Sequence, residues 1–440
     1  MKTADLRIEA APAYRMPMGW FALAPFFLVL AGVLLLSEGP ELFLSRWHPA
    51  ALALTHLFAL GFMGSVMVGA LMQVIPVLSG QSWPQRWRRS RWPLAAFAGG
   101  VLALAAHFLW TGSLSVAHAL AGVALALLLA ALAPVAFLTL WLLLRIPSLS
   151  DSIRDLRWVA AGLGLTVTLG ALLLLQRIAP DHFAFDHLQW VTLHLSAAWG
   201  LWGLALVATV GFVVVPMFQL TPVYPPTTRR RFTTALWGAA LITFIFSVIH
   251  PEKTPLWVVL GVGWLAWAFA AQTLALQDRS KRKKRETTGH LWRGAMIALC
   301  LAVAMAFASA TLPEFSPFLV GIMVFWGGFA GVICAMWIKI IPFLTWLNIQ
   351  QMPNRKGFPP TMLKITPEKE GERLRWLWLA TLLLLFAAVF LPEPMSRVAG
   401  IAVIATAVQL ARILWHAWQL FNEWERKHLD PTESAQIATS

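Results

Sequence analysis

The sequence predicts an all-α, polytopic membrane protein with twelve transmembrane helices, and its composition and apolar runs carry this prediction. Of the 440 residues, 59% are hydrophobic and only 12% are charged, about half the charged share of a typical soluble domain. The apolar residues gather in runs of roughly 20, long enough for a helix to cross about 30 Å of hydrocarbon. This pattern excludes a soluble enzyme, a disordered chain and a disulfide scaffold. It also disfavours a β-barrel, whose strands alternate over about ten residues.

Each apolar run is expected to be a helix, because backbone groups in lipid must pair within their own segment. The expected spans are 18–36, 49–78, 93–111, 114–144, 158–177, 188–219, 233–250, 255–277, 292–312, 316–348, 376–392 and 395–421. Residues 1–440 then form one integral membrane domain. It contains repeat units at about 18–144, 158–277 and 292–421, and residues 422–440 form a cytoplasmic tail.

Basic residues alternate from one connection to the next and so predict the orientation. The N-terminal segment, the even-numbered connections and the C-terminal tail hold 28 of the 34 Lys and Arg residues. The odd-numbered connections hold only Arg46, Arg177, Lys253 and Arg397. Because basic loops stay in the cytoplasm, we expect both termini on the cytoplasmic side of a bacterial inner membrane. Topology therefore accounts for the net charge of +14, and no nucleic-acid partner is expected.

Three spans share a sequence pattern. HLFALGFMGSVMVGALMQVIPVLSG begins at His56, HLSAAWGLWGLALVATVGFVVVPMFQLTP at His194, and GIMVFWGGFAGVICAMWIKIIPFLTWLN at Gly321. Each has a glycine-rich middle and then a proline followed by two apolar residues; the prolines are Pro76, Pro216 and Pro342. These spans lie four apart and so run in the same direction. The pattern therefore predicts three parallel units around a pseudo-threefold axis, unlike the antiparallel copies of inverted-repeat transporters. The glycines fit close helix packing or clearance for a flat macrocycle.

His56 and His194 are candidate site residues, because each opens a repeat span. They lie 20 and 22 residues before the proline of their span, and so at similar depth. A polar ring in a membrane helix must point inward and find a partner, and imidazole is a common axial ligand of haem iron. Their spacing leaves both haem ligation and structural hydrogen bonding open. The other histidines on the outer side are interpreted as ordinary interfacial residues.

Lys339 is a third candidate, inside the tenth span and three residues before its proline. No acidic residue lies in the middle of a span, whereas proton pumps and ion-coupled carriers usually keep a buried carboxylate. Two interpretations of Lys339 remain open. Its ammonium group reaches the cytoplasmic headgroups, or it forms an entry point for a proton or an anion.

Twelve spans in three units, with histidines on the outer side of the repeat spans, resemble subunit I of the haem-copper oxidases. The quoted segment from His56 is similar to the second helix of small relatives of that subunit, including the NnrS family linked to nitric oxide response. The segment MWIKIIPFLTWLNIQ, which contains Pro342, is similar to the corresponding segment near the end of these relatives. The resemblance implies a cytochrome oxidase subunit I-like fold, with His56 as a ligand of haem b and His194 as a second candidate ligand.

The same resemblance makes copper, and oxygen reduction at a haem-copper centre, improbable. The paired histidines expected on the seventh helix are missing, since that span ends in a lone His250. The tenth span has no histidine, and Tyr14 and Tyr224 both lie outside the spans. Without these groups the chain lacks the ligands and the tyrosine of a full oxygen-reducing site.

The expected function is electron transfer, or a response to nitric oxide or metal stress, by a membrane protein that binds haem b. The lipid bilayer and a respiratory or electron-donor protein are the expected partners. Whether the protein is an enzyme stays open. One alternative is a small-molecule permease, although its spans offer few polar residues: Gln73, Thr209, Gln272 and Lys339. The other alternative is a cofactor-free assembly partner of a respiratory complex.

The charge alternation yields a direct test of topology. Reporter domains fused after residues 85, 228 and 283 should report the cytoplasm, because these residues lie in basic connections. Fusions after residues 113 and 252, which lie in connections with few basic residues, should report the outside. The measurement is the activity of reporters that work on one side of the membrane only. An inverted result at any two of these sites would contradict the twelve-helix topology.

Overall fold

The computed structural model describes residues 7–146, 150–183, 185–312, 314–352 and 357–428. Within these ranges the chain is helical and contains no β-strand, so the all-α prediction is confirmed. The last twelve residues of the expected cytoplasmic tail, 429–440, lie outside the described residues.

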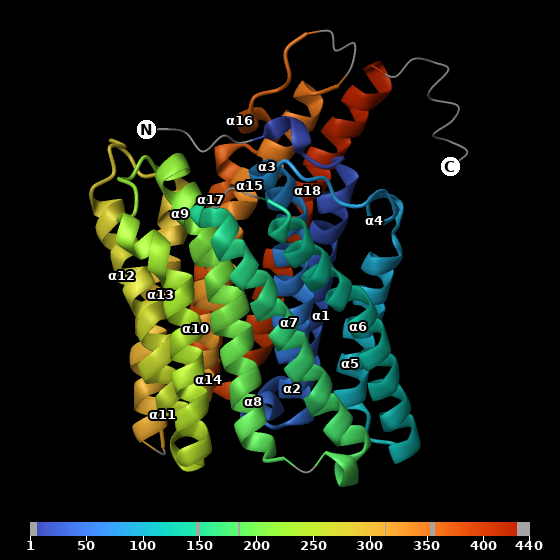
Figure 1. Cartoon of the computed structure of the whole chain (residues 1–440), viewed down its shortest axis with the longest axis vertical. Coiled ribbons are helices and arrows are strands. Elements are labelled where there is room, and N and C mark those ends of the chain that lie inside the picture. Colours follow the sequence, from blue (N-terminus) through green and yellow to red (C-terminus); the bar gives the residue numbers. More distant parts are fainter. Residues whose placement is uncertain (1–6, 147–149, 184, 313, 353–356, 429–440) are drawn as a thin grey trace.

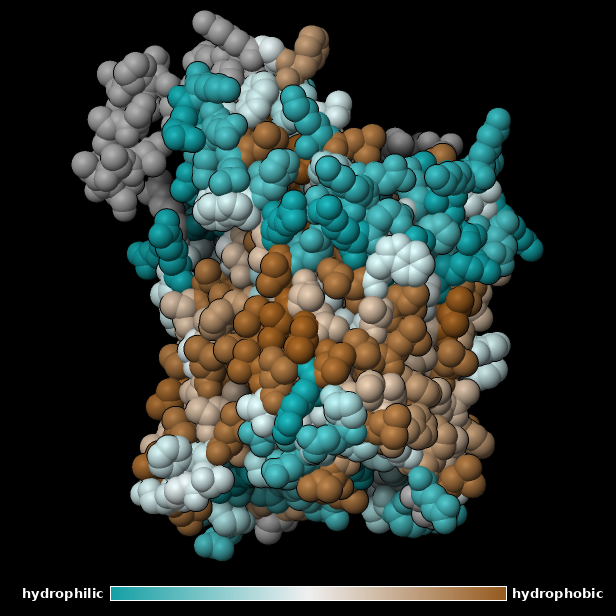
Figure 2. All heavy atoms as spheres, turned by 180° about the vertical axis from the view of Figure 1, so that it is seen from behind, coloured by the Kyte–Doolittle hydropathy of each residue, from teal (hydrophilic) through white to brown (hydrophobic). Residues whose placement is uncertain are grey.

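Twelve helical segments are long and apolar enough to cross a membrane, as the sequence predicted. Their bounds are Arg15–Phe43, Pro49–Ser79, Trp92–Leu109, Leu114–Leu144, Asp151–Ile178, His187–Gln219, Pro226–Ile249, Pro251–Asp278, Thr287–Thr311, Pro317–Gln350, Glu368–Phe390 and Pro392–Lys427, numbered below as spans 1 to 12. A belt of apolar side chains runs between two polar ends (Figure 2). A polytopic membrane protein presents such a belt to the hydrocarbon layer.

The spans are built from the following elements (Figure 1). Spans 1 to 4 contain α1 (Arg15–Glu38), η2 (Gly39–Phe43), α2 (Pro49–His56), η3 (Leu57–Gly64), α3 (Ser65–Ser79), α5 (Trp92–Leu109) and α6 (Leu114–Leu144). Spans 5 to 8 contain α7 (Asp151–Ile178), α8 (His187–Ser196), η5 (Ala197–Leu204), α9 (Ala205–Gln219), α10 (Pro226–Ile249), η6 (Pro251–Lys253), α11 (Thr254–Val258), η7 (Val259–Gly263) and α12 (Trp264–Asp278). Spans 9 to 12 contain α13 (Thr287–Thr311), α14 (Pro317–Ile322), η8 (Met323–Ala330), α15 (Gly331–Gln350), α17 (Glu368–Phe390) and α18 (Pro392–His428). Short helices α4 (Gln85–Arg89) and α16 (Met362–Ile365) lie in connections.

Four helices begin five to eight residues before the predicted start of their span. They are spans 5, 7, 9 and 11, which begin at Asp151, Pro226, Thr287 and Glu368. Hydropathy marks only the stretch that fits the hydrocarbon layer, whereas a helix can continue into the polar interface. At the start of α7, the Ser150 hydroxyl accepts a hydrogen bond from the Ile153 backbone N–H at 3.3 Å. A serine N-cap of this kind stabilises a first turn that carries little apolar surface.

The three repeat spans share an unexpected backbone feature. Spans 2, 6 and 10 each contain a π-helical segment, which begins 19 residues before the proline of that span, at Leu57, Ala197 and Met323. A π-helical turn holds an extra residue compared with an α-helical turn and occurs often at functional sites. The glycine-rich pattern did not predict these segments, because the same residue types also fit an α-helix. Their common register extends the sequence repeat to backbone conformation.

The packing between helices recurs every four spans. Span 1 packs on span 2, span 5 on span 6, and span 9 on span 10. Spans 3 and 4 pair in the same way as spans 7 and 8 and spans 11 and 12. The junctions recur as well, since span 4 packs on span 5, span 8 on span 9, and span 12 on span 1. The last helix thus closes a ring on the first, and α18 lies beside α1 in Figure 1.

The ends of spans 1 and 12 are joined by polar and aromatic contacts. Arg15 forms an ion pair with Glu425 at 2.7 Å. The Tyr14 ring stacks on Phe421 with 4.0 Å between centroids, and its hydroxyl bonds the Thr345 hydroxyl at 3.0 Å. Burial raises the pKa of Tyr14, so this phenol stays protonated and keeps the bond. These contacts fix the closure of the ring at its predicted cytoplasmic end.

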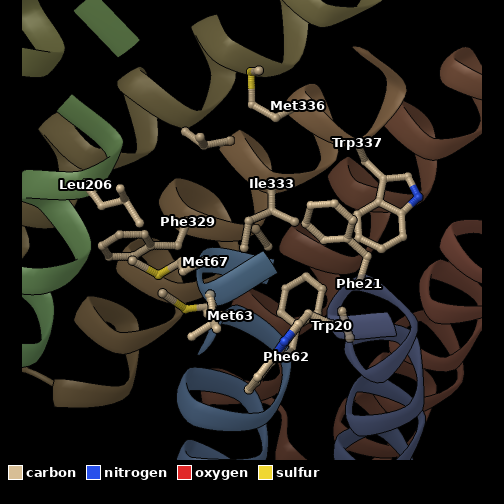
Figure 3. Close-up of a cluster of buried hydrophobic side chains, with 14 of the residues drawn as sticks. Trp20, Phe21, Phe62, Met63, Met67, Leu206, Phe329, Ile333, Met336 and Trp337 are labelled. Atoms are coloured by element: carbon tan, nitrogen blue, oxygen red, sulfur yellow. The ribbon is translucent and has the colours of Figure 1, made fainter. Parts of the chain in front are cut away.

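Apolar side chains fill the space between the repeat spans. Phe62 and Met67 come from span 2, Leu206 from span 6, and Phe329 and Ile333 from span 10 (Figure 3). All five side chains are buried. We call them, with their labelled neighbours in Figure 3, the central apolar cluster. The five side chains carry no hydrogen-bonding group, and the indole N–H of the neighbouring Trp337 is bonded to the Leu410 carbonyl oxygen at 3.2 Å, so this part of the described structure offers no polar path for a hydrophilic solute.

Two glycines allow spans 1 and 12 to cross closely, and this crossing is testable. A Cβ atom at Gly400 would lie 2.8 Å from the Gly32 carbonyl oxygen, whereas a Cβ at Gly238 in α10 meets no heavy atom within 4 Å. Gly400→Val should therefore lower the free energy of unfolding by about 1–3 kcal/mol through overpacking. The control Gly238→Val should change it by about 0.5 kcal/mol or less. Denaturation of the detergent-purified chain measures both, and equal stability of the two variants would contradict this packing.

Candidate functional site

A cavity of about 1010 Å³ lies toward the odd-numbered connections, the predicted outer side. It extends from Trp47 and Lys253, near these connections, to Met67 and Phe329 of the central apolar cluster. Its lining is mainly aliphatic and aromatic, with a few polar groups. A cavity of this composition suits a ligand with a large apolar body and few polar atoms. We call it the outer cavity.

His56 is the last residue of α2 and lines the outer cavity. Its Nδ1 lies 2.8 Å from the Leu52 carbonyl oxygen, one turn earlier. A carbonyl oxygen can only accept, so Nδ1–H donates this bond and Nε2 keeps its lone pair. The ring also packs on Phe108, with 5.0 Å between centroids. Metal-binding imidazoles are commonly held in this way, with the other ring nitrogen bonded to a carbonyl group.

His194 lies in α8 and lines the same cavity. Its Nδ1 is buried and has no hydrogen-bond partner within the described ranges. A Cβ atom on Gly170 of α7 would lie 3.0 Å from the His194 Cε1 atom, so glycine at 170 leaves room for the ring. The structure thus brings the two predicted histidines to one cavity.

The two histidines do not occupy equivalent positions of the repeat. His56 lies directly before η3, whereas His194 lies three residues before η5. An offset of two residues corresponds to about 3 Å along a helix and about 200° around it. The two side chains therefore lie at similar depth, as predicted, but they project from different faces of their helices. The corresponding residues of span 10, Val320 and Ile322, line the cavity with apolar side chains.

Cations at the rim of the outer cavity were not predicted as site residues. Arg46, Arg177 and Lys253 line it, and they are three of the four basic residues in the odd-numbered connections. No ion pair of any of the three is found within the part of the chain that the structure describes, although Glu252 also lines the cavity. Basic residues are disfavoured in connections on the outer side of a membrane. Their presence in the odd-numbered connections was therefore the sequence feature that could have identified these three residues.

His187 also lines the cavity, although its sequence position suggested only an interfacial residue. Its Nδ1 lies 2.8 Å from the Gln176 side-chain oxygen, so Nδ1–H donates to that oxygen. The amide of Gln176 in turn donates to the Phe185 carbonyl oxygen at 2.8 Å. This chain of bonds holds the start of α8, and with it the helix that carries His194. No group of three or more His, Cys, Asp or Glu side chains that could hold a metal ion occurs among the described residues.

The glycines of the repeat spans mostly serve close packing, which is one of their two predicted roles. A Cβ atom would lie 2.6 Å from the Phe27 ring at Gly61, 2.9 Å from the Phe329 ring at Gly203, and 2.6 Å from an alanine Cβ at Gly327. Neighbouring side chains therefore occupy the space that these glycines leave. Clearance for a macrocycle is confined to the few glycines on the cavity wall, such as Gly64 and Gly321.

Lys339 lies outside the outer cavity, and its ammonium group is paired. Nζ donates to a carboxylate oxygen of Glu286 at 2.8 Å. The other oxygen of Glu286 accepts a short hydrogen bond from Arg282. The Lys339 side chain is 25% exposed, and Glu286 lies directly before α13, so this ion pair lies toward the predicted cytoplasmic end of span 10. Neither interpretation from the sequence included Glu286, because it lies 53 residues away along the chain.

The other polar residues considered for a permeation path do not line the outer cavity either. Neither Gln73, Thr209 nor Gln272 belongs to its lining. The Thr209 hydroxyl donates to the Ala205 carbonyl oxygen at 2.7 Å, within its own helix. Met63, Met67 and Phe329 of the central apolar cluster (Figure 3) also line the cavity. The geometry therefore gives the permease alternative no continuous polar lining between the described helices.

No family model matches the chain, and no curated protein matches its sequence. The resemblance to the oxidase subunit therefore rests on the quoted motifs, and the assignment of a function rests on the cavity and its side chains.

The Glu286 ion pair predicts a small effect of removing Lys339. Lys339→Met should lower the free energy of unfolding by about 1 kcal/mol or less, because a partly exposed ion pair contributes little and Arg282 still pairs with Glu286. Denaturation of the purified chain measures this, with Lys284→Met as a control at an exposed lysine. A loss of several kcal/mol in Lys339→Met alone would assign this lysine a larger structural role.

Proposed function

We propose that the chain is an oxidase-subunit-I-like protein of the bacterial inner membrane, that it binds one haem b in the outer cavity, and that it acts in electron transfer or in a response to nitric oxide or metal stress. The observation that carries this proposal is that His56 and His194, from two repeat spans, line one large apolar cavity. A respiratory or electron-donor protein is its proposed partner beside the lipid bilayer.

The side chains of the outer cavity fit the chemistry of such a group. The bond from His56 Nδ1–H to Leu52 leaves Nε2 as a σ-donor. The buried Nδ1 of His194 lacks a partner, and an unpaired buried polar atom costs about 1–3 kcal/mol unless a ligand satisfies the group. The apolar walls suit a macrocycle, and Arg46, Arg177 and Lys253 suit its two carboxylates.

Several residues of this chain would control the chemistry of the site. Haem iron, when bound, supplies one-electron transfer and binding of small gaseous ligands. His56, held by Leu52 and Phe108, would hold the iron through its free ring nitrogen. The apolar walls would exclude water, so a change in the net charge of the site would cost more free energy than it would in water. The guanidinium carbon of Arg177 lies 5.3 Å from the centroid of the Phe108 ring. Arg177 would therefore place a positive charge next to the ring that packs on His56.

We further propose a pseudo-threefold arrangement of four-helix units at about 18–144, 158–277 and 292–421, as in the oxidase subunit. Two observations support it: the packing order that recurs every four spans, and the π-helical segments at one register before Pro76, Pro216 and Pro342. Both termini are proposed to be cytoplasmic.

Absorbance of the purified chain tests this function. Expressed with ample haem supply, the wild type should show a Soret band, and His56→Ala should lose or shift it, because an axial ligand fixes the iron and its spin state. His107→Ala is the matched control, since His107 is also a buried histidine whose Nδ1–H donates to a backbone carbonyl, that of Ala117 at 2.9 Å. It should leave the spectrum unchanged. His194→Ala should act like His56→Ala only if both rings bind one iron.

Two outcomes would contradict the proposal. An identical spectrum of His56→Ala and the wild type, at full incorporation, would refute the ligand assignment. A wild type without any Soret band would leave the two alternatives: uptake of a small molecule would favour a permease, and its absence a cofactor-free assembly partner.

A further inference from the structure

A second, smaller pocket of about 280 Å³ lies at the opposite, predicted cytoplasmic end of the molecule. It is formed by the ends of α9 and α12, the connection 279–286, and the first turn of α13. In Figure 1 these elements meet at the top left, whereas α11, whose residues Leu256 and Val258 line the outer cavity, lies toward the bottom. Its lining is mainly polar, and we call it the inner polar pocket.

The basic connection is fixed in place over the end of α9. Lys281 N–H donates to the Leu220 carbonyl oxygen at 3.1 Å, and the Ser280 hydroxyl donates to the Gln219 carbonyl oxygen at 2.6 Å. These bonds satisfy carbonyl groups that the end of a helix leaves without partners. The run from Lys281 to Arg285 is therefore more than a solvated charge cluster, because its backbone is held against the pocket.

Buried polar groups of the pocket lack partners. Gln219, Gln277 and Thr288 line it and are only 7%, 2% and 2% exposed. The Gln277 amide donates to the Gln219 side-chain oxygen at 2.7 Å. Whichever way the two amides are turned, this one bond leaves an unpaired N–H₂ group and an unpaired C=O group. The Thr288 hydroxyl and the Arg282 Nε also have no partner within the described ranges.

So many unpaired groups in one place indicate a ligand, because buried polar groups in native proteins are almost always paired. The free groups are mainly donors: an amide N–H₂, the Arg282 Nε–H and the Thr288 hydroxyl. The first-turn N–H groups of α13 add donors, since they have no partner inside the helix and carry a partial positive charge. The N-cap residue, Glu286, makes no side-chain bond to them.

The charges around the pocket favour an anion. Arg282, Lys283 and Arg285 line it together with two carboxylates, Asp278 and Glu286. Asp278 pairs with Arg293 at 2.6 Å and with Arg285 at 3.9 Å, and Glu286 pairs with Lys339 at 2.8 Å and with Arg282. Five cations thus surround two carboxylates, and Lys283 has no ion pair within the described ranges. The remaining charge of the lining is positive.

We propose that the inner polar pocket binds a phosphate group, with Thr288, one of the two glutamines and the Nε–H group of Arg282 as donors and Lys283 as a further counter-charge. Helix N-termini combined with cationic side chains are common sites for phosphate. The group belongs either to free inorganic phosphate or to the headgroup of an anionic phospholipid at the cytoplasmic surface. The site is separate from the outer cavity and does not depend on haem binding.

Thermal unfolding of the full-length chain in a neutral detergent tests the site. One titration uses inorganic phosphate at constant ionic strength, with chloride as reference, and a second uses short-chain phosphatidic acid. A ligand that binds the folded state raises the midpoint of unfolding with its concentration. We expect a saturable rise in the wild type, with phosphate if the free ion binds, or with phosphatidic acid alone if the group comes from lipid.

Two pairs of variants locate the binding. Lys283→Gln should weaken it about tenfold and Lys284→Gln should not, because both lysines are exposed neighbours but only Lys283 lines the pocket. Thr288→Val should weaken it similarly, whereas Thr139→Val should not, because Thr139 is an equally buried, unpartnered threonine outside the pocket. Lys283 is exposed, so its replacement keeps the test valid even where Thr288→Val does not fold. The proposal is overturned if neither ligand shifts the midpoint, or if Lys283→Gln and Lys284→Gln bind alike.

Discussion

The hydrocarbon layer forces every backbone N–H and C=O group inside it to pair within its own helix, and the rest of this structure depends on that constraint. It leaves helices as the only elements that the chain can use to cross, and it turns apolar side chains outward, where they form the belt of Figure 2. Polar side chains are then confined to the interior or to the two ends. The outer cavity and the inner polar pocket follow this division, because the first lies among the spans and the second at one end of them.

The same constraint explains which features could be predicted from the sequence. A helix that must be apolar over some 20 residues leaves a strong signal, so eleven of the twelve spans were predicted within about four residues at the end that meets an odd-numbered connection; span 1 continues seven residues further, to Phe43. The starts of spans 5, 7, 9 and 11 were placed too late, because polar first turns such as that of α7 continue beyond the hydrocarbon. The π-helical segments left no signal, since they change which backbone groups pair and not which residues are apolar.

The candidate site was only partly predictable for a different reason. His56 and His194 stood out because each opens a repeat span at similar depth, and both do line the outer cavity. Their surroundings depend on residues that are distant in sequence: Phe108 beside His56, Gly170 beside His194, and the cations of three separate connections. The partner of Lys339 was missed for the same reason, since Glu286 belongs to another helix. Single side chains can be selected from the sequence, but the contacts between spans come only from the fold.

Some features recur in all three repeat spans and others differ between them, and this difference bears on function. Features that recur in all three repeat spans, namely the prolines, the π-helical segments and the packing order, shape the scaffold. A ligand with a single reactive centre cannot use a threefold site equally, so its groups should be found where the repeats differ. The histidines fit this expectation, because they are offset by two residues in spans 2 and 6, and Val320 and Ile322 replace them in span 10. The histidines of the outer cavity thus lie where the chain departs from its own repeat, whereas the recurring features serve helix packing.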